Sequence, residues 1–137
     1  MRYAIRYMKS KREIYEYIFN KTNDEYITND IINKLIENHI IDDNKIIDSY
    51  IYSYIINSNG INMIKEKLYQ KGFNQSLIVK KILDIDYDLY YEYLKKLYNK
   101  IKNKYDNPND YIRINKIKNY LYQRGYTYSD MEELDIK

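Results

Sequence analysis

The chain of 137 residues contains no cysteine and no tryptophan, only one proline and only three glycines. Without cysteine there is no disulfide scaffold, no thiolate zinc site and no thiol nucleophile. No apolar run approaches the roughly 18 residues of a membrane-spanning helix, so we expect a soluble protein. The basic first twelve residues are not followed by the apolar stretch of a signal peptide, which makes a cytoplasmic location the expectation.

Four residue types dominate what is present: 24 Ile, 20 Tyr, 18 Lys and 16 Asn. A/T-rich codons encode all four residue types, so an A/T-rich genome explains this composition at least as well as a specific function does. A surface rich in tyrosine and lysine is therefore weak support for nucleic-acid stacking. The core must rely on isoleucine and bury many tyrosine rings whose hydroxyls reach water or a polar partner.

Apolar residues recur at helical spacing along the whole chain, and strand signals are scarce. The pattern predicts helices over residues 10–21, 24–38, 44–57, 61–71, 75–83, 84–105 and 110–124, and a short one from 127 or 128. Ser10 and Glu13 have the spacing of a capping box. The pair Asp42-Asp43, and further on Asp110, are expected to cap the helices that follow them. In the second helix, the predicted apolar stripe consists of Ile27, Ile31, Leu35 and Asn38, and Ile32 and Ile36 widen it.

A ten-residue segment occurs twice. Residues 64–73 align with residues 117–126 at a shift of 53 positions, with six identities, and each copy has a glycine followed by an aromatic residue. Residues 14–23 form a weaker third copy, in which Thr22 stands at the glycine position. Repeats of this length favour tandem helical modules that stack side by side.

Basic residues are concentrated in residues 1–12, 64–81 and 95–124. A single basic block is usually a solvated helix face, but blocks at equivalent repeat positions favour a shared basic surface. The candidate residues for binding a partner or DNA are therefore seven cations on or near the repeated helices: Lys65, Lys67, Lys71, Arg113, Lys116, Lys118 and Arg124. The competing interpretation is that these side chains only keep two related helices soluble.

Residues for catalysis or metal binding are scarce. His39 is the only histidine, and a role at a helix end explains it better than catalysis. The acidic triplet at 84, 86 and 88 lacks the glycine and the distal glutamate of a calcium loop. No nucleophile, general base or glycine-rich phosphate loop accompanies these groups. We therefore expect no catalytic residues, no metal, no cofactor and no enzymatic activity.

Motifs in this order resemble the RecX family of bacterial recombination regulators. They are Ser10-Lys-Arg-Glu13-Ile14, the stretch from Leu35 to Ile40-Ile41-Asp42-Asp43, the segment from Gly60 to Gly72, and the segment from Lys116 to Tyr126. The opening Ala4-Ile5-Arg6-Tyr7-Met8 is similar to the short N-terminal helix of that family. The resemblance covers nearly the whole chain, from Ala4 to Leu134.

The resemblance implies an all-α protein of three tandem three-helix modules in an elongated, curved array, with expected boundaries at 1–57, 58–105 and 106–137. It implies a protein that binds the RecA recombinase filament and modulates its assembly, ATPase and strand exchange. For this chain we expect inhibition, by a monomer. Some members also bind single- or double-stranded DNA. The alternative is a stand-alone DNA-binding module of helix-turn-helix type. A net charge of only +3, and the lack of a helix that collects base-reading side chains, argue against this alternative.

Overall fold

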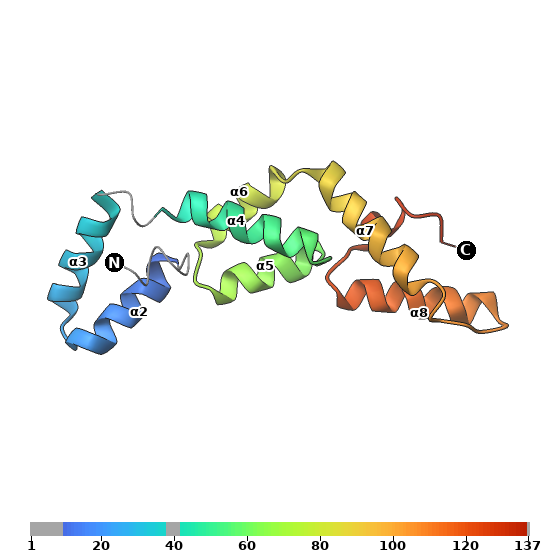
Figure 1. Cartoon of the computed structure of the whole chain (residues 1–137), viewed down its shortest axis with the longest axis horizontal. Helices are drawn as coiled ribbons and strands as arrows, with labels where there is room; N and C mark the ends of the chain where they lie inside the picture. Colours follow the sequence, from blue (N-terminus) through green and yellow to red (C-terminus); the bar gives the residue numbers. More distant parts are fainter. Residues whose placement is uncertain (1–9, 38–41, 137) are drawn as a thin grey trace. The chain divides into compact units, whose positions relative to one another are not determined.

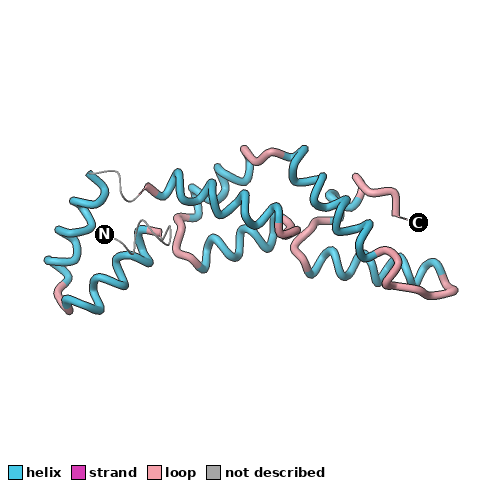
Figure 2. Tube along the Cα trace, in the orientation of Figure 1, coloured by secondary structure: helices cyan, strands magenta, loops and turns pink. Residues whose placement is uncertain are grey.

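The computed structural model describes residues 10–37 and 42–136, and over these ranges it contains eight helices and no strand (Figures 1 and 2). The expected N-terminal helix and His39 lie outside the described residues. The helices are α2 (Lys11–Thr22), α3 (Glu25–Glu37), α4 (Asp43–Ile56), α5 (Ile61–Gln70), α6 (Gln75–Leu83), α7 (Tyr87–Ile101), α8 (Asp110–Gln123) and α9 (Tyr128–Met131). The all-α prediction is confirmed, and most helix ends lie within one or two residues of the predicted ones.

Local capping chemistry sets the helix starts. At α2 the Ser10 side chain accepts from the Glu13 N–H, and the Glu13 carboxylate accepts from the Ser10 N–H, so the predicted capping box is present. The prediction for α8 is wrong in its detail, because Asn109 is the cap and Asp110 is the first helical residue. The amide oxygen of Asn109 accepts two N–H groups of the first turn, while the Asp110 carboxylate is placed to favour the positive end of the helix dipole.

The first helix end departs from the repeat. Thr22, which replaces the repeat glycine, is still helical, and Asn23 takes the left-handed conformation one residue later (φ 51°). Asparagine tolerates this region better than β-branched threonine does. Without the glycine, the left-handed residue that ends α2 lies one position further along the chain than in the other copies.

The chain divides into two compact units, Met1–Tyr50 with Lys67–Lys81, and Ile51–Glu66 with Ile82–Lys137. In the first unit α2 packs against α3, and their contact is a cluster of Ile14, Ile18, Ile32 and Leu35. The second unit has its own core, which includes Ile64, Tyr90, Leu94, Ile117, Leu121 and Tyr126, each at most 1% exposed. The three module boundaries expected from the sequence stay a prediction.

The apolar stripe predicted for α3 is partly correct. Ile32 and Leu35 are buried as expected, whereas Ile27 and Ile36 are 48% and 37% exposed. Thr28, which the stripe did not include, is buried as well. The Thr28 hydroxyl bonds to the Asp24 carbonyl, which lets a polar side chain enter the core. Within the described ranges no helix is long and apolar enough to cross a membrane.

Candidate partner-binding surface

The two copies of the repeat adopt the same local structure. Each helix ends in a glycine in the left-handed region, Gly72 at φ +93° and Gly125 at φ +99°, as the repeat predicts. The residue after each glycine donates its N–H back into the helix, and its ring is buried. Three apolar pairs correspond between the copies: Ile64 with Ile117, Leu68 with Leu121, and Phe73 with Tyr126.

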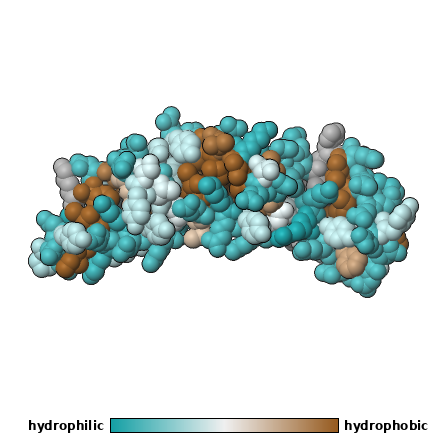
Figure 3. All heavy atoms as spheres, turned by 180° about the vertical axis from the view of Figure 1, so that it is seen from behind, coloured by the Kyte–Doolittle hydropathy of each residue, from teal (hydrophilic) through white to brown (hydrophobic). Residues whose placement is uncertain are grey.

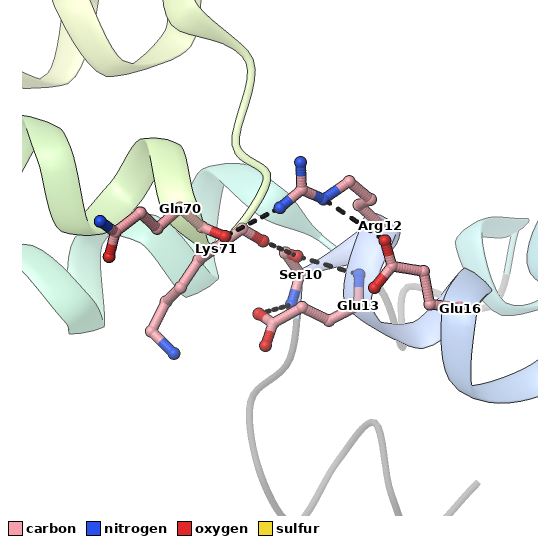
Figure 4. A network of polar contacts seen from close by, with 6 residues as sticks. All are labelled: Ser10, Arg12, Glu13, Glu16, Gln70 and Lys71. Carbon is pink, nitrogen blue, oxygen red and sulfur yellow. Dashed lines mark hydrogen bonds and ion pairs between the residues drawn. The ribbon is translucent and has the colours of Figure 1, made fainter.

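In the first unit, the start of α2 is bonded to the end of α5 (Figure 4). The Ser10 hydroxyl donates to the Lys71 carbonyl at 2.7 Å, and the Arg12 guanidinium donates to the Gln70 carbonyl at 2.8 Å. Both carbonyls are among those that a helix leaves without internal partners at its end. The side chain of Arg12 occupies the space that a Cβ on Gly72 would need, so the glycine makes this close approach possible.

In the second unit, the end of α8 receives the equivalent support from the start of α5. The Gly60 N–H donates to the Arg124 carbonyl at 2.8 Å, and the Asn62 N–H donates to the Gly125 carbonyl at 3.0 Å. A Cβ on Gly60 would meet the main chain of Gly125. Each glycine turn of the repeat is therefore held by the N-terminal end of another helix.

Arg124 is a structural cation as well as a candidate contact. Its guanidinium donates to the Asn57 carbonyl at 2.7 Å and to the Ser58 carbonyl at 2.9 and 3.1 Å, where α4 ends. A basic group at a helix C-terminus satisfies free carbonyls and complements the helix dipole. Charge reversal at Arg124 would therefore disturb structure, which makes this residue a poor position for testing partner contact alone.

The cations of the first unit are partly engaged. The Lys71 ammonium lies 4.5 Å from the centroid of the Tyr50 ring, a cation–π contact, and its side chain is half-buried. Lys67 is also half-buried. Both belong to the first compact unit, whereas the other five candidates belong to the second.

The cations of the second unit differ in exposure. Lys65 on α5 and Lys116 on α8 are exposed, and Lys118 is half-buried. The Arg113 side chain is 19% exposed and pairs with Asp110 at 3.8 Å. Lys65 and Lys116 are therefore the two candidates whose charge faces solvent most fully.

Sequence reasoning missed a buried polar cluster in the second unit. The Tyr90 hydroxyl donates to the Asp130 carboxylate at 2.7 Å and accepts from the Ile61 N–H at 3.0 Å. Burial, and then the hydrogen bond to Asp130, raise the pKa of Tyr90 far above its ordinary value, so the phenol stays neutral. Thr127 and Asp130 form a capping box at α9, and their spacing is visible in the sequence, but the partnership with Tyr90 is not.

The described residues contain no group of three or more histidine, cysteine or acidic side chains that could hold a metal ion. On the face that Figure 3 shows, the surface is mostly hydrophilic and a few apolar patches interrupt it. Several tyrosine rings are more than half exposed: Tyr26, Tyr52, Tyr69, Tyr111, Tyr122 and Tyr128. The geometry thus offers cations and aromatic rings for binding.

Known proteins with similar sequences and structures point in one direction. The family model described as "RecX, third three-helix domain" matches residues 88–133, which include most of α7 and all of α8 and α9. The crystal structure of RecX from Lactobacillus salivarius matches with a TM-score of 0.83 at 25% identity, over 95% of this chain and 88% of that one. A second structure, of a regulatory protein RecX, matches with a TM-score of 0.78 at 26% identity, over 90% of this chain and 62% of that one.

Curated relatives agree along most of the chain. The regulatory protein RecX of Clostridium tetani is 30% identical over 131 residues, which are 92% of this chain and 59% of the relative. That of Streptococcus mutans is 26% identical over 135 residues, which are 94% of this chain and 51% of the relative. The chain therefore spans little more than half the length of these two relatives. Sequence, family model and fold agree that the chain is similar to the RecX regulatory proteins over most of its length.

Proposed function

We propose that this chain binds the RecA recombinase filament and inhibits its assembly, ATPase and strand-exchange activity. The proposal rests on the similarity to the RecX proteins, which are regulatory proteins rather than enzymes. The observation that carries it furthest is the repeated helix with a glycine stop, because each copy has a lysine directly after its first buried isoleucine. These are Lys65 after Ile64 and Lys118 after Ile117.

The mechanism is steric and electrostatic. Cations repeated on related helices suit a partner whose acidic patches or phosphates repeat at a fixed spacing. Binding that bridges neighbouring filament subunits would oppose growth or favour loss of subunits without any covalent step. The chain acts as a monomer in the cytoplasm and needs no cofactor in this proposal.

The test is a titration of the host's own recombinase on single-stranded DNA. We expect the chain to lower the filament's ATPase and strand-exchange rates at substoichiometric ratios. An unchanged ATPase over the whole titration would refute the proposal. A rise in ATPase or strand exchange would mean that the chain binds the filament but activates it, which would contradict the proposed inhibition.

The contact residues require a separate experiment. In the double variant Lys65→Glu, Lys116→Glu, two exposed cations of the second unit are reversed, and we expect the inhibitory potency to fall by about tenfold or more. The matched control is Lys34→Glu, Lys45→Glu, which changes the net charge equally at exposed positions outside the candidate set. Equal loss in both variants would show that only net charge matters.

Stand-alone DNA binding is the second candidate function. It predicts tight, sequence-dependent binding to naked duplex, and gel shifts with and without recombinase separate it from filament binding. The exposed lysines and tyrosines are compatible with DNA contact, but they do not read base edges as a recognition helix does.

A further inference from the structure

The segment that follows α9 is acidic and lies beside basic side chains. Glu132, Glu133 and Asp135 are all exposed, and the half-buried Leu134 stands between them. This segment belongs to the same compact unit as α7 and α8. The stretch from residue 95 to 124 is the most basic part of the chain, and cations from it line two hollows together with the acidic side chains of the segment.

On one side the segment borders α7. Lys95, Tyr98 and Lys102 lie at spacings of three, four and seven residues, which places them on one helix face. Together with Glu133 and Asp135 they line an open hollow of about 480 Å³. The Tyr98 hydroxyl donates to the Asp135 carbonyl at 3.4 Å, and the Lys102 ammonium lies 5.9 Å from the Tyr98 ring centroid.

On the other side the segment borders α8. Lys118 and Tyr128 line a second open hollow, of about 450 Å³, together with Glu132 and Asp135. The Tyr128 ring, 61% exposed, stacks on the Tyr122 ring at 5.5 Å. Three carboxylates therefore share two hollows with three ammonium groups, next to a pair of exposed rings.

The backbone bonds at the start of the segment are local. The Glu132 N–H donates to the Tyr128 and Ser129 carbonyls, the Glu133 N–H to the Asp130 carbonyl, and the Leu134 N–H to the Met131 carbonyl. The Tyr98 contact at 3.4 Å is long for a hydrogen bond between two oxygens. A mostly exposed segment whose backbone bonds are local opens at lower free-energy cost than a buried core element does.

We propose that residues 132–136 act as an internal competitor that occupies a binding surface for single-stranded nucleic acid on α7 and α8. Phosphates would meet Lys95, Lys102 and Lys118, and bases would stack on Tyr122 and Tyr128. The carboxylates stand near the same cations as the phosphates would, so binding requires that the segment move aside. The stacked rings favour a single strand over an acidic protein surface, since unpaired bases offer flat faces for stacking.

This proposal deepens the proposed function, because a recombinase filament carries single-stranded DNA, but it does not depend on the recombinase. The assay therefore uses the full chain and a fluorescein-labelled oligothymidine alone, followed by anisotropy at low salt. A failure here leaves filament inhibition untouched, and a failure of filament inhibition leaves this measurement meaningful.

The decisive variant is Glu132→Gln, Glu133→Gln, Asp135→Asn in the full chain. Its matched control is Glu25→Gln, Glu37→Gln, Asp84→Asn, which removes the same three charges from exposed positions on other elements. We expect the decisive variant to bind oligothymidine at least about fivefold more tightly than the control, with the ratio falling as salt rises. Circular dichroism checks that both variants remain helical.

Three outcomes overturn the proposal. Equal affinities of the two variants would mean that net charge alone sets binding. Absence of oligothymidine binding in every variant would reject nucleic acid as the partner and leave an acidic protein surface. Unchanged affinity in Tyr122→Ala, Tyr128→Ala on the decisive background would exclude base stacking at this site.

A second measurement tests the movement directly. Hydrogen exchange of residues 131–136 should speed up when oligothymidine binds the unmodified chain, because the Leu134 N–H loses its partner. Slower exchange in this segment would show that it closes over the ligand, which contradicts competition.

Discussion

Two buried tyrosines in one cluster have opposite hydrogen-bonding situations. The rings of Tyr90 and Tyr126 lie 5.5 Å apart, and burial raises the pKa of both. Tyr90 has two polar partners, whereas the Tyr126 hydroxyl is buried without a hydrogen-bond partner among the described residues. The other copy of the repeat has Phe73 at this position, and its ring has no hydroxyl that needs a hydrogen-bond partner.

We therefore expect Tyr126→Phe to leave the free energy of unfolding unchanged or to raise it by up to about 1 kcal/mol, because an unsatisfied buried hydroxyl is removed. Tyr90→Phe is the matched control and should lower it by about 1–3 kcal/mol, since the Asp130 carboxylate and the Ile61 N–H lose a partner. Urea unfolding followed by circular dichroism measures both. A loss in Tyr126→Phe as large as in Tyr90→Phe would contradict the assignment.

Asp43 predicts a pH dependence. Burial raises the pKa of its carboxyl even though the Lys11 N–H donates to it at 3.0 Å. The folded state then holds this proton more tightly than the unfolded state, so the contribution of Asp43 to stability falls as the pH rises through the raised pKa. Asp43→Asn keeps an oxygen acceptor and removes the titration. Its Tm relative to the unmodified chain should therefore increase from about pH 3 to pH 7, and thermal scans with the opposite trend would exclude this cause.

At the scale of the element, helix ends explain the repeat. Two glycines in the left-handed region, Gly72 and Gly125, end equivalent helices, but their neighbours differ. A Cβ on Gly72 would meet the flexible side chain of Arg12, whereas one on Gly125 would meet the Cβ and main-chain nitrogen of Met63. The loss of stability on replacing each glycine therefore depends on the atoms that are packed against its turn.

Alanine substitution should separate these cases. Gly72→Ala should lower the free energy of unfolding by about 1–2 kcal/mol, the cost of the left-handed backbone. Gly125→Ala should lower the free energy of unfolding by more than this. The added Cβ clashes with Met63 near the start of α5, in addition to the backbone strain. Chemical denaturation of the two variants gives the order, and equal losses would show that the packing of Met63 adapts freely.

At the scale of the whole molecule, a net charge of +3 on 137 residues limits nonspecific binding to DNA. Basic and acidic stretches alternate along the chain, so few phosphates can be neutralised together. We expect binding to naked duplex to be no tighter than about micromolar near physiological salt, with a shallow dependence of affinity on salt. Anisotropy titrations at several salt concentrations test this. Nanomolar, sequence-dependent binding would favour the helix-turn-helix alternative.

The local signals in the sequence were sufficient for most elements. The capping box at Ser10 and the glycine stop at Gly72 appear where the pattern predicts them, because each depends on residues a few positions apart. The apolar stripe of α3 was only partly predicted. Ile32 and Leu35 are buried as expected, but the burial of Thr28 in place of Ile27 depends on the position of α2, which residue spacing does not reveal. For the candidate site, spacing identified the cations but not their exposure or partners.

Short-range chemistry and residue order are sufficient to predict the helices, their stops, the repeat and the resemblance to RecX proteins. The folded chain adds three contacts: Arg124 bonds to the end of α4, Tyr90 bonds to Asp130, and an acidic segment lies beside Lys102 and Lys118. These contacts join residues far apart along the chain, so their free energies depend on packing that no local pattern encodes.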